Sequence, residues 1–399
     1  MRFNQQTPIL FISSYPPRKC GIASFTEDLV NAINAESRNG TAISICALDK
    51  RNPAKVYEHP VTMLMDSHDI DSCIETAMRI NRDDSIKLIC IEHEFGLFGG
   101  ELGEYLLGFL SILEKPFIVR FHTVLPSPSP KRLKIVRTIS SLADKVIVMT
   151  NHSASLLEND YSIPGEKILR IPHGTHNHST TDPLALKHRH NLDNRLVLTN
   201  FGLLSPNKGI EKGILAMKEI SKKFPEAIYL VLGQTHPSLI AQEGEKYRDY
   251  LLQLIAENNL QENVRLINEY IPTEKLMEYL TLTDIYLLTS KDPNQAISGT
   301  FLYAMSAGCP IISNSFVLAK EMLDEKTGVI LETNDEKELA EQAIRLLEDK
   351  MLRKQMGYNA FIRTRNTAWK KVAAKHIRLF AEVVGSPVAI PGLSNQFVS

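Results

Sequence analysis

Two short segments of the sequence join a loop of small residues to the start of a helix, and both could bind an anion. In "FGLLSPNKGIEKG", Lys208 and Gly209 precede a helical segment, and in "NQAISGTFLYAMSAGCPIIS", Ser298, Gly299 and Thr300 crowd the start of another. The first N–H groups of a helix lack partners within it, and the helix dipole favours negative charge there. An ammonium beside such an end suits a diphosphate, so the two segments together predict a clamp on two phosphates. Neither segment matches G-x-G-x-x-G or a P-loop, which disfavours a dinucleotide cofactor and ATP.

The loop "SSYPPRKCGIASF" in the first half of the chain is long and basic for a turn between a strand and a helix. Gly21 allows a close approach of the backbone, and Arg18 and Lys19 add positive charge. The alternative is a plain turn capped by Ser24 or Thr26. We favour a loop that faces a ligand.

The loop "EHEFGLFGG" follows an apolar run and is rich in acids, aromatics and glycines, which favours contact with a substrate. Glu92, His93 and Glu94 are of metal-ligand type, but three consecutive side chains cannot all converge on one ion. His122 stands where the apolar run "PFIVRFH" ends, before a loop rich in Pro and Ser. It is either a capped core histidine or, as we favour, a site residue whose ring or backbone hydrogen-bonds to a sugar hydroxyl.

A histidine-rich stretch in the middle of the chain raises the question of zinc. Its spacings match no tetrahedral template, and its surroundings are typical of a flexible connector. We therefore predict no metal site there. The histidines are His173, His176, His178, His188 and His190.

Short apolar runs alternate with amphipathic segments, in two successive series. The predicted strands are 8–13, 42–48, 87–93, 116–122 and 146–150, then 195–202, 227–233, 263–268, 284–290 and 310–313. Buried strands separated by helices predict α/β architecture, with two doubly wound Rossmann-like domains. Ligands of such sheets bind beyond the C-terminal ends of the strands, so we expect a cleft between two facing domains.

We predict domain boundaries from the same rhythm. The chain should consist of an N-terminal domain (1–175), a linker (176–194), a second domain (195–365), a C-terminal helix (366–383) and a tail (384–399) without periodicity.

Composition excludes several functional classes. The formal net charge of −1 gives no general electrostatic attraction to nucleic acid or to membrane surfaces. The five cysteines include no C-x-x-C pair, no apolar run reaches the length of a membrane-spanning helix, and the first residues do not form a signal peptide. We therefore expect a cytoplasmic protein.

Taken in order, several motifs resemble retaining glycosyltransferases of glycosyltransferase family 4, which have the GT-B fold. They are "PPRKCGIASFTEDL", "HEFGLFGG", "FHTV", "IPHG", "FGLLSPNKGIE" and "SGTFLYAMSAGCPIIS", and the resemblance covers residues 7–383. "AWKKVAAKHIRLF" is similar to the family's C-terminal helix, which crosses back onto the first domain.

The resemblance implies a sugar transfer with retention of configuration, from a UDP- or GDP-linked sugar in the second domain to a saccharide or glycan acceptor on the first. It implies no cofactor and no essential metal. Implied donor-side residues are Lys208 at the diphosphate, His122 beside the sugar as the other catalytic residue, and Gly21, Gly209, Ser298, Gly299 and Thr300. Implied nucleotide contacts are Gly233, Gln234, Thr235, Tyr270 and Ile271, and we place Lys19, Glu94, Phe95 and Gly96 on the acceptor side.

Three positions depart from the family pattern. Gln295 and Tyr303 stand where two glutamates usually contact the donor sugar and the ribose, and Leu203 stands where an arginine usually accompanies the lysine. Glutamine can still bond to hydroxyls but carries no charge, whereas tyrosine cannot accept bonds from both ribose hydroxyls. Loss of the guanidinium removes a bidentate phosphate contact.

These departures leave two alternatives to an active hexosyltransferase. The first is a catalytically silent glycosyltransferase-like subunit that partners an active homologue. The second is another GT-B enzyme, a sugar phosphorylase or a nucleotide-sugar epimerase.

Overall fold

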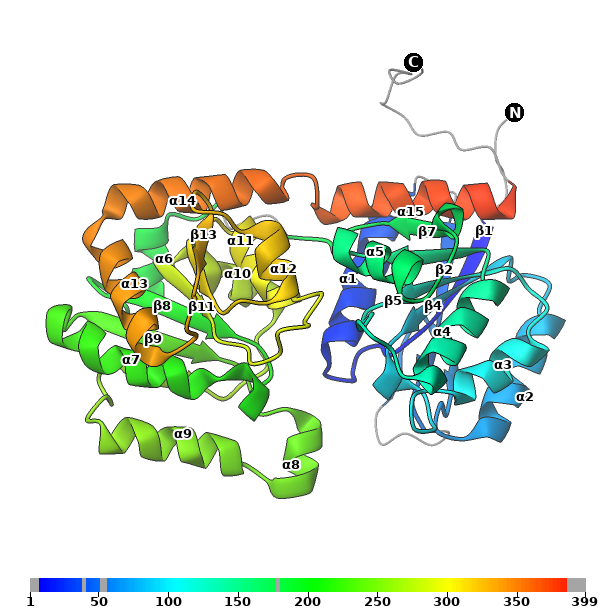
Figure 1. Ribbon diagram of the computed structural model, residues 1–399. Helices are drawn as coiled ribbons and strands as arrows, with labels where there is room; N and C mark the ends of the chain where they lie inside the picture. Colours follow the sequence, from blue (N-terminus) through cyan, green and yellow to red (C-terminus); the bar gives the residue numbers. More distant parts are fainter. Residues whose placement is uncertain (1–6, 38–40, 51–55, 177–179, 386–399) are drawn as a thin grey trace, which may run out of the picture. The chain divides into compact units, whose positions relative to one another are not determined.

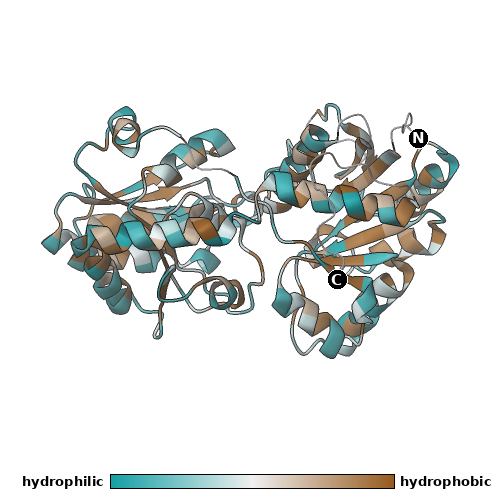
Figure 2. Cartoon of the chain, turned by 90° about the horizontal axis from the view of Figure 1, so that it is seen from above, coloured by the Kyte–Doolittle hydropathy of each residue, from teal (hydrophilic) through white to brown (hydrophobic). Residues whose placement is uncertain are grey.

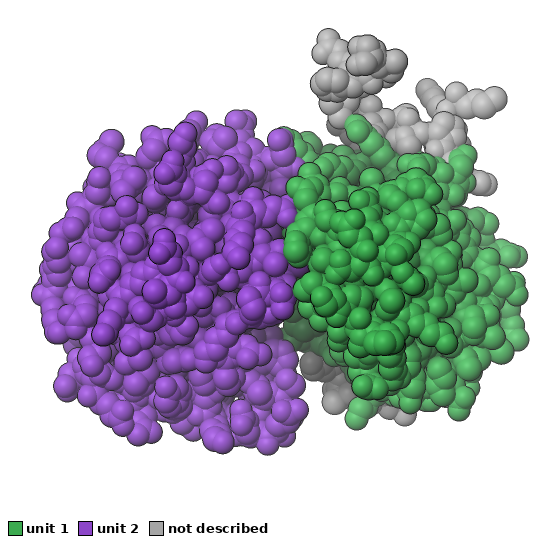
Figure 3. Space-filling model, viewed as in Figure 1, with its two compact units in different colours: residues 1–172, 369–399 green, residues 173–368 purple. Residues whose placement is uncertain are grey.

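The computed structural model describes residues 7–37, 41–50, 56–176 and 180–385. The chain divides into two compact units, which are coloured separately in Figure 3. Unit 1 consists of residues 1–172 and 369–399, and unit 2 of residues 173–368.

Unit 1 is built on a seven-stranded parallel sheet with the order β3-β2-β1-β4-β5-β6-β7 (Figure 1). Its strands are β1 (Thr7–Ser13), β2 (Thr41–Leu48), β3 (Val61–Met65), β4 (Leu88–His93), β5 (Phe117–Phe121), β6 (Lys145–Val148) and β7 (Ile168–Arg170). Its helices are α1 (Gly21–Glu36), α2 (Ile70–Arg82), α3 (Tyr105–Ile112), α4 (Pro130–Leu142), α5 (Asn151–Asn159) and α15 (Trp369–Val384), with short 3₁₀ turns at Phe95–Leu97 and Gly165–Lys167.

Unit 2 repeats this plan with a six-stranded parallel sheet of order β10-β9-β8-β11-β12-β13. Its strands are β8 (Leu196–Phe201), β9 (Ala227–Leu232), β10 (Val264–Ile267), β11 (Ile285–Leu288), β12 (Ile311–Ser313) and β13 (Gly328–Ile330). Its helices are α6 (Pro183–Arg189), α7 (Ile210–Lys223), α8 (Pro237–Glu243), α9 (Lys246–Glu257), α10 (Thr273–Thr281), α11 (Gly299–Ser306), α12 (Val317–Met322), α13 (Glu336–Glu348) and α14 (Lys350–Thr364), with a 3₁₀ turn at Pro206–Lys208.

The central strands are apolar because both faces of each sheet are covered by helices. Every residue of β4, β5 and β9 is buried, and the strands are predominantly brown in Figure 2, where brown marks hydrophobic residues. Two parallel, helix-covered sheets confirm the predicted pair of doubly wound α/β domains. The cleft expected between them stays a prediction.

Three strands went unpredicted, and all three lie at sheet edges. These are β3, β7 and β13, of five, three and three residues. An edge strand pairs on one side only and needs few apolar residues, so its periodic signal is weak. The ten predicted strands correspond to the ten others, with ends that differ by at most two residues.

The structure shows what the predicted linker and the predicted C-terminal helix contribute to the two units. The segment expected as a linker, 176–194, contains α6, whose Leu186 is fully buried in the core of unit 2. Residues 177–179, with His178, and 386–399 of the tail lie outside the described residues. The C-terminal helix α15 packs against α1 of unit 1 and buries one apolar face, which includes Trp369, Val372 and Phe380.

Among the residues that the structure describes, no helix has both the length and the apolar character needed to cross a membrane.

Candidate functional site

The C-terminal edge of the sheet in unit 2 carries two loops that are locked to each other by backbone hydrogen bonds. The loop after β8 and the loop after β9 are joined by the bond from Leu204 N–H to the carbonyl of Gln234 (2.9 Å) and by that from His236 N–H to the carbonyl of Leu204 (2.9 Å). Gly233 N–H in turn donates to the carbonyl of Ile267 (3.0 Å), the last residue of β10. The loops therefore form a fixed backbone surface where ligands of such sheets bind.

Two of the predicted glycines are required by this close backbone packing. Gly209 has φ 62°, and a Cβ there would lie 2.3 Å from the carbonyl oxygen of Thr289. Gly233 has φ 140°, and a Cβ there would lie 2.1 Å from the carbonyl oxygen of Gly202. Both positions exclude a side chain for a reason internal to unit 2. Gly209 brings the Lys208 loop against the loop after β11.

Lys208 is a partly buried cation that has no counter-charge among the described residues. It ends the 3₁₀ turn at Pro206–Lys208, and its carbonyl accepts a hydrogen bond from Thr289 Oγ1 (2.7 Å). Its ammonium has no ion pair or hydrogen bond with any other residue that the structure describes, and burial lowers its pKa. A desolvated, unpaired ammonium is costly in the free protein, so its position favours an anionic ligand.

His236 lies close enough to Lys208 for the lysine charge to shift the pKa of the histidine. Its Nδ1 accepts a hydrogen bond from Ser238 N–H (3.2 Å), so the remaining ring proton belongs on Nε2. Burial lowers the pKa of this histidine, and the Lys208 charge lowers it further. The two donors therefore lie in the same neighbourhood, and His236 N–H bonds to the carbonyl of Leu204, the residue after Leu203.

The start of α11 lies beside the loop that leads to Lys208. A Cβ on Gly202 would lie 3.5 Å from Thr300 Cγ2. Ser298 caps the helix by accepting from Phe301 N–H (3.3 Å) and is 3.1 Å from Thr300 Oγ1. The structure thus brings the two predicted halves of the phosphate clamp onto adjacent loops, while Ser298 also serves as an ordinary cap.

His173 covers the start of α11, which the sequence did not predict. A Cβ on Gly299 would lie only 3.1 Å from His173 Nε2, and the imidazole is buried. Its Nδ1 donates to the carbonyl of Gly174 (2.7 Å). The sequence around the histidine-rich stretch indicates a flexible connector, but His173 belongs to the packed body of unit 2. The motif "IPHG" was the only signal for it.

Both ends of the Gln295 side-chain amide form hydrogen bonds within the loop after β11. Its Oε1 accepts from Ser290 Oγ (3.0 Å), and its Nε2 donates to the carbonyl of Ile297 (2.9 Å). Tyr303 is buried in the core of unit 2 and meets the ring edges of His173 (centroids 5.9 Å apart) and His176 (4.9 Å). Where the family pattern has two carboxylates, this chain has an amide that fixes a loop and an aromatic cluster.

The predicted nucleotide-side residues have mixed surroundings. Thr235 is buried, and its hydroxyl donates to Glu245. Arg248 donates to the carbonyl of Gly233 (2.9 Å) and pairs with Glu245 (3.3 Å). Glu245 and Arg248, which sequence reasoning missed, thus hold the loop after β9 in place. In the sequence, only the charge of these two residues could have indicated this role, because the segment is predicted as a helix without a site residue.

The second predicted nucleotide segment is divided. Tyr270 is 42% exposed, whereas Ile271 is buried in the core of unit 2. A buried isoleucine can offer only its backbone to a ligand, whereas the Tyr270 side chain is partly exposed.

His122 in unit 1 belongs to a buried chain of polar side chains. Its Nε2 is 2.7 Å from Glu92 Oε2, and Arg120 Nη1 donates to Glu92 Oε1 (2.7 Å). Arg120 also contacts His376 of α15, whose Nδ1 donates to the carbonyl of Val372 (2.8 Å). Glu92, Arg120 and His376 are fully buried. His376 lies 256 residues from Arg120 in the sequence, which explains why sequence reasoning did not connect it with His122.

The residues expected to face an acceptor or ligand lie in two loops of unit 1. Glu94 accepts from Phe95 N–H (2.9 Å) and from Thr123 Oγ1 (2.5 Å), so it fixes the turn that Phe95 begins. Gly21 is the first residue of α1, and a Cβ on Gly21 or Gly96 would meet nothing within 4 Å. No steric demand of the protein itself requires these two glycines.

Lys19 lies in the exposed loop just before α1, one residue from the helix cap. The cap is Cys20, whose Sγ accepts from Ala23 N–H (3.4 Å). Neither Ser24 nor Thr26, which we had considered as caps, fills this role, because α1 begins at Gly21.

The three consecutive residues that resemble metal ligands have separate surroundings. Glu92 bonds to Arg120 and His122, whereas Glu94 bonds within its own turn. His93 packs against a cage of phenylalanines. Within the described part of the chain, no three His, Cys, Asp or Glu side chains are grouped to hold a metal ion.

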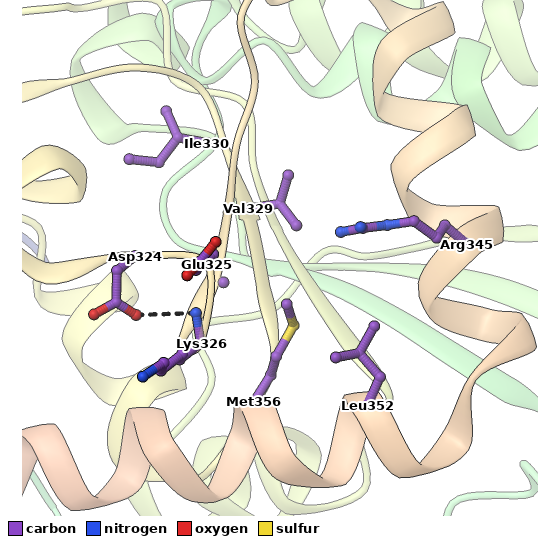
Figure 4. Close-up of a pocket in the computed structure, with 9 residues that line it drawn as sticks. Asp324, Glu325, Lys326, Val329, Ile330, Arg345, Leu352 and Met356 are labelled. Atoms are coloured by element: carbon purple, nitrogen blue, oxygen red, sulfur yellow. Dashed lines mark hydrogen bonds between the residues drawn. The ribbon is translucent and has the colours of Figure 1, made fainter.

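A groove runs along β13, the edge strand of the sheet in unit 2. Val329, Leu352 and Met356 line it together with the charged Asp324 and Arg345 (Figure 4). Asp324 precedes β13, so this end of the groove is at the N-terminal ends of the parallel strands, whereas Lys208 follows a strand. The groove is therefore separate from the candidate phosphate site.

Comparison with known proteins shows which proteins the chain resembles. Residues 185–363 match the family model of glycosyl transferases group 1. An uncharacterized glycosyltransferase of Methanocaldococcus jannaschii is 28% identical over 194 residues, which are 48% of this chain and 46% of that protein. A GDP-mannose-dependent alpha-(1-6)-phosphatidylinositol monomannoside mannosyltransferase of Mycolicibacterium smegmatis is 22% identical over 351 residues, 82% of this chain and 85% of that protein.

Solved structures share the fold. Sucrose-phosphate synthase from Thermosynechococcus elongatus superposes with a TM-score of 0.77 at 20% identity, covering 96% of this chain and 100% of that one. Anabaena HepE, solved in complex with UDP-glucose, gives 0.72 at 17% identity, covering 94% and 99%. At these identities the likeness shows the fold alone. The chain thus has the GT-B fold, and its similarity to glycosyl transferases group 1 lies in residues 185–363 of unit 2.

Proposed function

We propose that the protein is a retaining glycosyltransferase of family 4 that moves a hexosyl group from a UDP- or GDP-linked sugar to a saccharide or glycan acceptor. The observation that carries the proposal is the ammonium of Lys208, which is partly buried and has no counter-charge among the described residues. It lies in the fixed loop after β8, within the segment that matches the group 1 model. The two sequence relatives named above are transferases, which supports this reading over a phosphorylase or an epimerase.

In the proposed reaction, Lys208 and the start of α11 bind the diphosphate. The acceptor hydroxyl oxygen bonds to the anomeric carbon on the face from which the phosphate leaves, and its proton passes to the departing phosphate oxygen. The bond between the anomeric carbon and that oxygen breaks, giving the glycoside and a nucleoside diphosphate. Fixed positive charge at the leaving group lowers the barrier, because the developing charge is stabilised without reorganisation.

The proposal includes no essential metal, because the ammonium of Lys208 and the unpaired N–H groups of α11 supply positive potential at the phosphates. His236 Nε2–H adds a donor beside Lys208. His122 is assigned to a hydroxyl of the donor sugar, and the polar loops of unit 1 to the acceptor.

Calorimetric titration with UDP, GDP, UDP-glucose and GDP-mannose tests the donor site. We expect one nucleotide series to bind, and Lys208→Met to weaken that binding at least tenfold, because a charge-assisted phosphate contact contributes more than about 1.4 kcal/mol. Lys222→Met is the matched control, since Lys222 is exposed and pairs with Glu219. Absence of binding to all four ligands, or equal binding by the two variants, would overturn the proposal.

The same variant should be more stable without ligand. Burial disfavours the charged form of Lys208, so the apolar isostere should raise the free energy of unfolding by about 1 kcal/mol. Urea denaturation followed by circular dichroism measures this change in the free energy of unfolding.

Retention of configuration is checked by ¹H NMR of the glycoside, whose anomeric configuration should match that of the donor.

A further inference from the structure

The buried chain from α15 to His122 contains three side chains for which the proposed reaction has no use. Glu92, Arg120 and His376 are each fully buried, although charged and polar groups are rarely buried without a reason. Arg120 and His376 are 256 residues apart in the sequence, so α15 brings a histidine to the end of β5 from a distant part of the chain.

The donor and the acceptor of each hydrogen bond in this chain can be deduced in turn, beginning at His376 of α15. A carbonyl can only accept, so His376 donates its Nδ1–H to Val372 O (2.8 Å). Burial and the neighbouring Arg120 hold the pKa of His376 to about 3, so its ring is neutral and Nε2 carries a lone pair. That lone pair accepts from Arg120 Nη2, because arginine has no acceptor.

Arg120 is thereby fixed at three points. One guanidinium nitrogen donates to His376 and another to Glu92 Oε1 (2.7 Å), while the guanidinium carbon lies 4.8 Å from the ring centroid of Phe25. Burial alone would raise the pKa of Glu92, but Arg120 and the hydrogen bond with His122 outweigh it and lower the pKa. Glu92 is therefore an ionised carboxylate that can only accept.

An ionised Glu92 determines the proton position on His122. The 2.7 Å contact between Glu92 Oε2 and His122 Nε2 requires a proton on Nε2. In the neutral ring, Nδ1 then carries the lone pair. Nδ1 has no hydrogen-bond partner among the described residues, and the side chain is 7% exposed, beside the ring of Phe25 (centroids 5.1 Å apart).

We propose that His376, Arg120 and Glu92 are positioning residues that hold His122 as the Nε2–H tautomer, with Nδ1 aimed at a hydroxyl group of the substrate. A lone pair accepts from O–H but repels an anionic oxygen, so the group received at this point is a neutral sugar hydroxyl rather than a carboxylate or phosphate. The tautomer part concerns the free protein, and the hydroxyl part rests on the proposed glycosyltransferase function.

The tautomer is measured directly in the ligand-free full chain. With ¹⁵N-labelled histidine, two-bond ¹H–¹⁵N correlation spectra distinguish Nδ1–H from Nε2–H, and a His122→Gln spectrum assigns the signal. We expect pure Nε2–H in the wild type. His376→Leu, which leaves Arg120 without its acceptor, should shift His122 toward a mixture of tautomers. His376→Gln should restore the wild-type pattern, since its amide oxygen can accept from Arg120.

Two variants separate positioning from packing. Phe380→Leu lies on the same buried face of α15 and changes only ring packing, against Phe11 and His376, so it should lower stability while leaving the tautomer unchanged. If His376→Leu fails to fold, Glu92→Gln replaces it: its amide can donate to Nε2 and should move the proton to Nδ1. A wild-type Nδ1–H signal, or an unchanged tautomer in a folded His376→Leu or in Glu92→Gln, would overturn the proposal.

The kinetic prediction depends on the glycosyltransferase function. His376→Leu should lower kcat about tenfold with little change in the KM for the donor, because a misdirected Nδ1 costs about 1.4 kcal/mol in the transition state while Lys208 still binds the phosphates. An altered tautomer with unchanged kcat would refute the hydroxyl contact. If no nucleotide sugar is turned over at all, the proposed function fails. The spectra still decide whether His376, Arg120 and Glu92 fix the tautomer of His122.

Discussion

At the scale of single residues, Gln295 shows that a departure from a family pattern can be structural. A glutamate at this position would face the carbonyl of Ile297, where Gln295 now donates a hydrogen bond. The Gln295 carbonyl oxygen already accepts from Ser290 Oγ, so both ends of the amide have assigned partners. The hydrogen bonds of the loop after β11 therefore fit a glutamine at position 295 better than a glutamate.

Gln295→Glu should consequently weaken the protein instead of restoring an active site. We expect a loss of about 1–2 kcal/mol in the free energy of unfolding, because a donor to a partly buried carbonyl is lost and a carboxylate is brought against it. Urea denaturation gives the stability, and calorimetry the donor affinity, which should fall or stay constant. Asn294→Asp, at an exposed neighbouring position, is the control. A more stable variant with tighter donor binding would contradict this prediction.

At the scale of elements, the ends of β4 and β5 hold a histidine in an apolar cage. His93 is fully buried between Phe95, Phe98 and Phe121, and neither ring nitrogen has a hydrogen-bond partner among the described residues. Burial, with a smaller effect of His122, lowers its pKa to about 3. The turn after β4 therefore packs on a neutral imidazole.

This burial predicts a pH dependence of stability. The folded pKa of His93 lies below the unfolded value of about 6.5, so its contribution is complete above pH 6.5 and is lost as the pH falls toward 3. His93→Phe should reduce the fall in unfolding free energy between pH 7.5 and pH 5.0 by about 2 kcal/mol, at ~1.4 kcal/mol per pH unit below the unfolded pKa.

Fluorescence of Trp369, the only tryptophan, reports the unfolding of unit 1 in these experiments. His188→Phe, at an exposed histidine in unit 2, should leave the pH dependence of that signal as it is. Parallel stability curves for the wild type and His93→Phe would show that His93 is not held neutral by the fold.

At the scale of the whole molecule, unit 1 is discontinuous in sequence. Residues 1–172 fold together with α15, which the chain reaches only after completing unit 2. Helix α15 contributes buried side chains to unit 1 at Trp369, Val372, Leu379 and Phe380 and supplies the acceptor for Arg120.

Ending the chain after residue 368 should therefore destabilise unit 1 selectively. Each large buried apolar side chain contributes roughly 2–4 kcal/mol, so the loss should exceed the usual stability of a domain. We expect loss of slow hydrogen exchange in β1, β4 and β5, while donor binding by unit 2 persists in calorimetry. A chain ending after residue 385 is the control. Protected strands in the shorter chain would contradict the prediction.

Much of the fold was predictable because its signals are local. Runs such as "KLICIEH" and "AIYLVLG" are apolar throughout, and such runs between amphipathic helices indicate a parallel sheet covered on both faces. Edge strands such as β7 and β13 were missed, because three residues carry no periodicity. The cytoplasmic location stays a prediction.

The sequence by itself determined the two α/β repeats, the position of Lys208 at a strand end, and the absence of a P-loop, since each depends on residues within one short segment. Only the tertiary structure decided that Lys208 lacks a counter-charge in the described part of unit 2, that Gln295 belongs to its loop, and that His376 reaches Arg120. Such contacts join residues far apart in the chain, and sheet order and the return of α15 create them. No local pattern of residue types encodes that geometry.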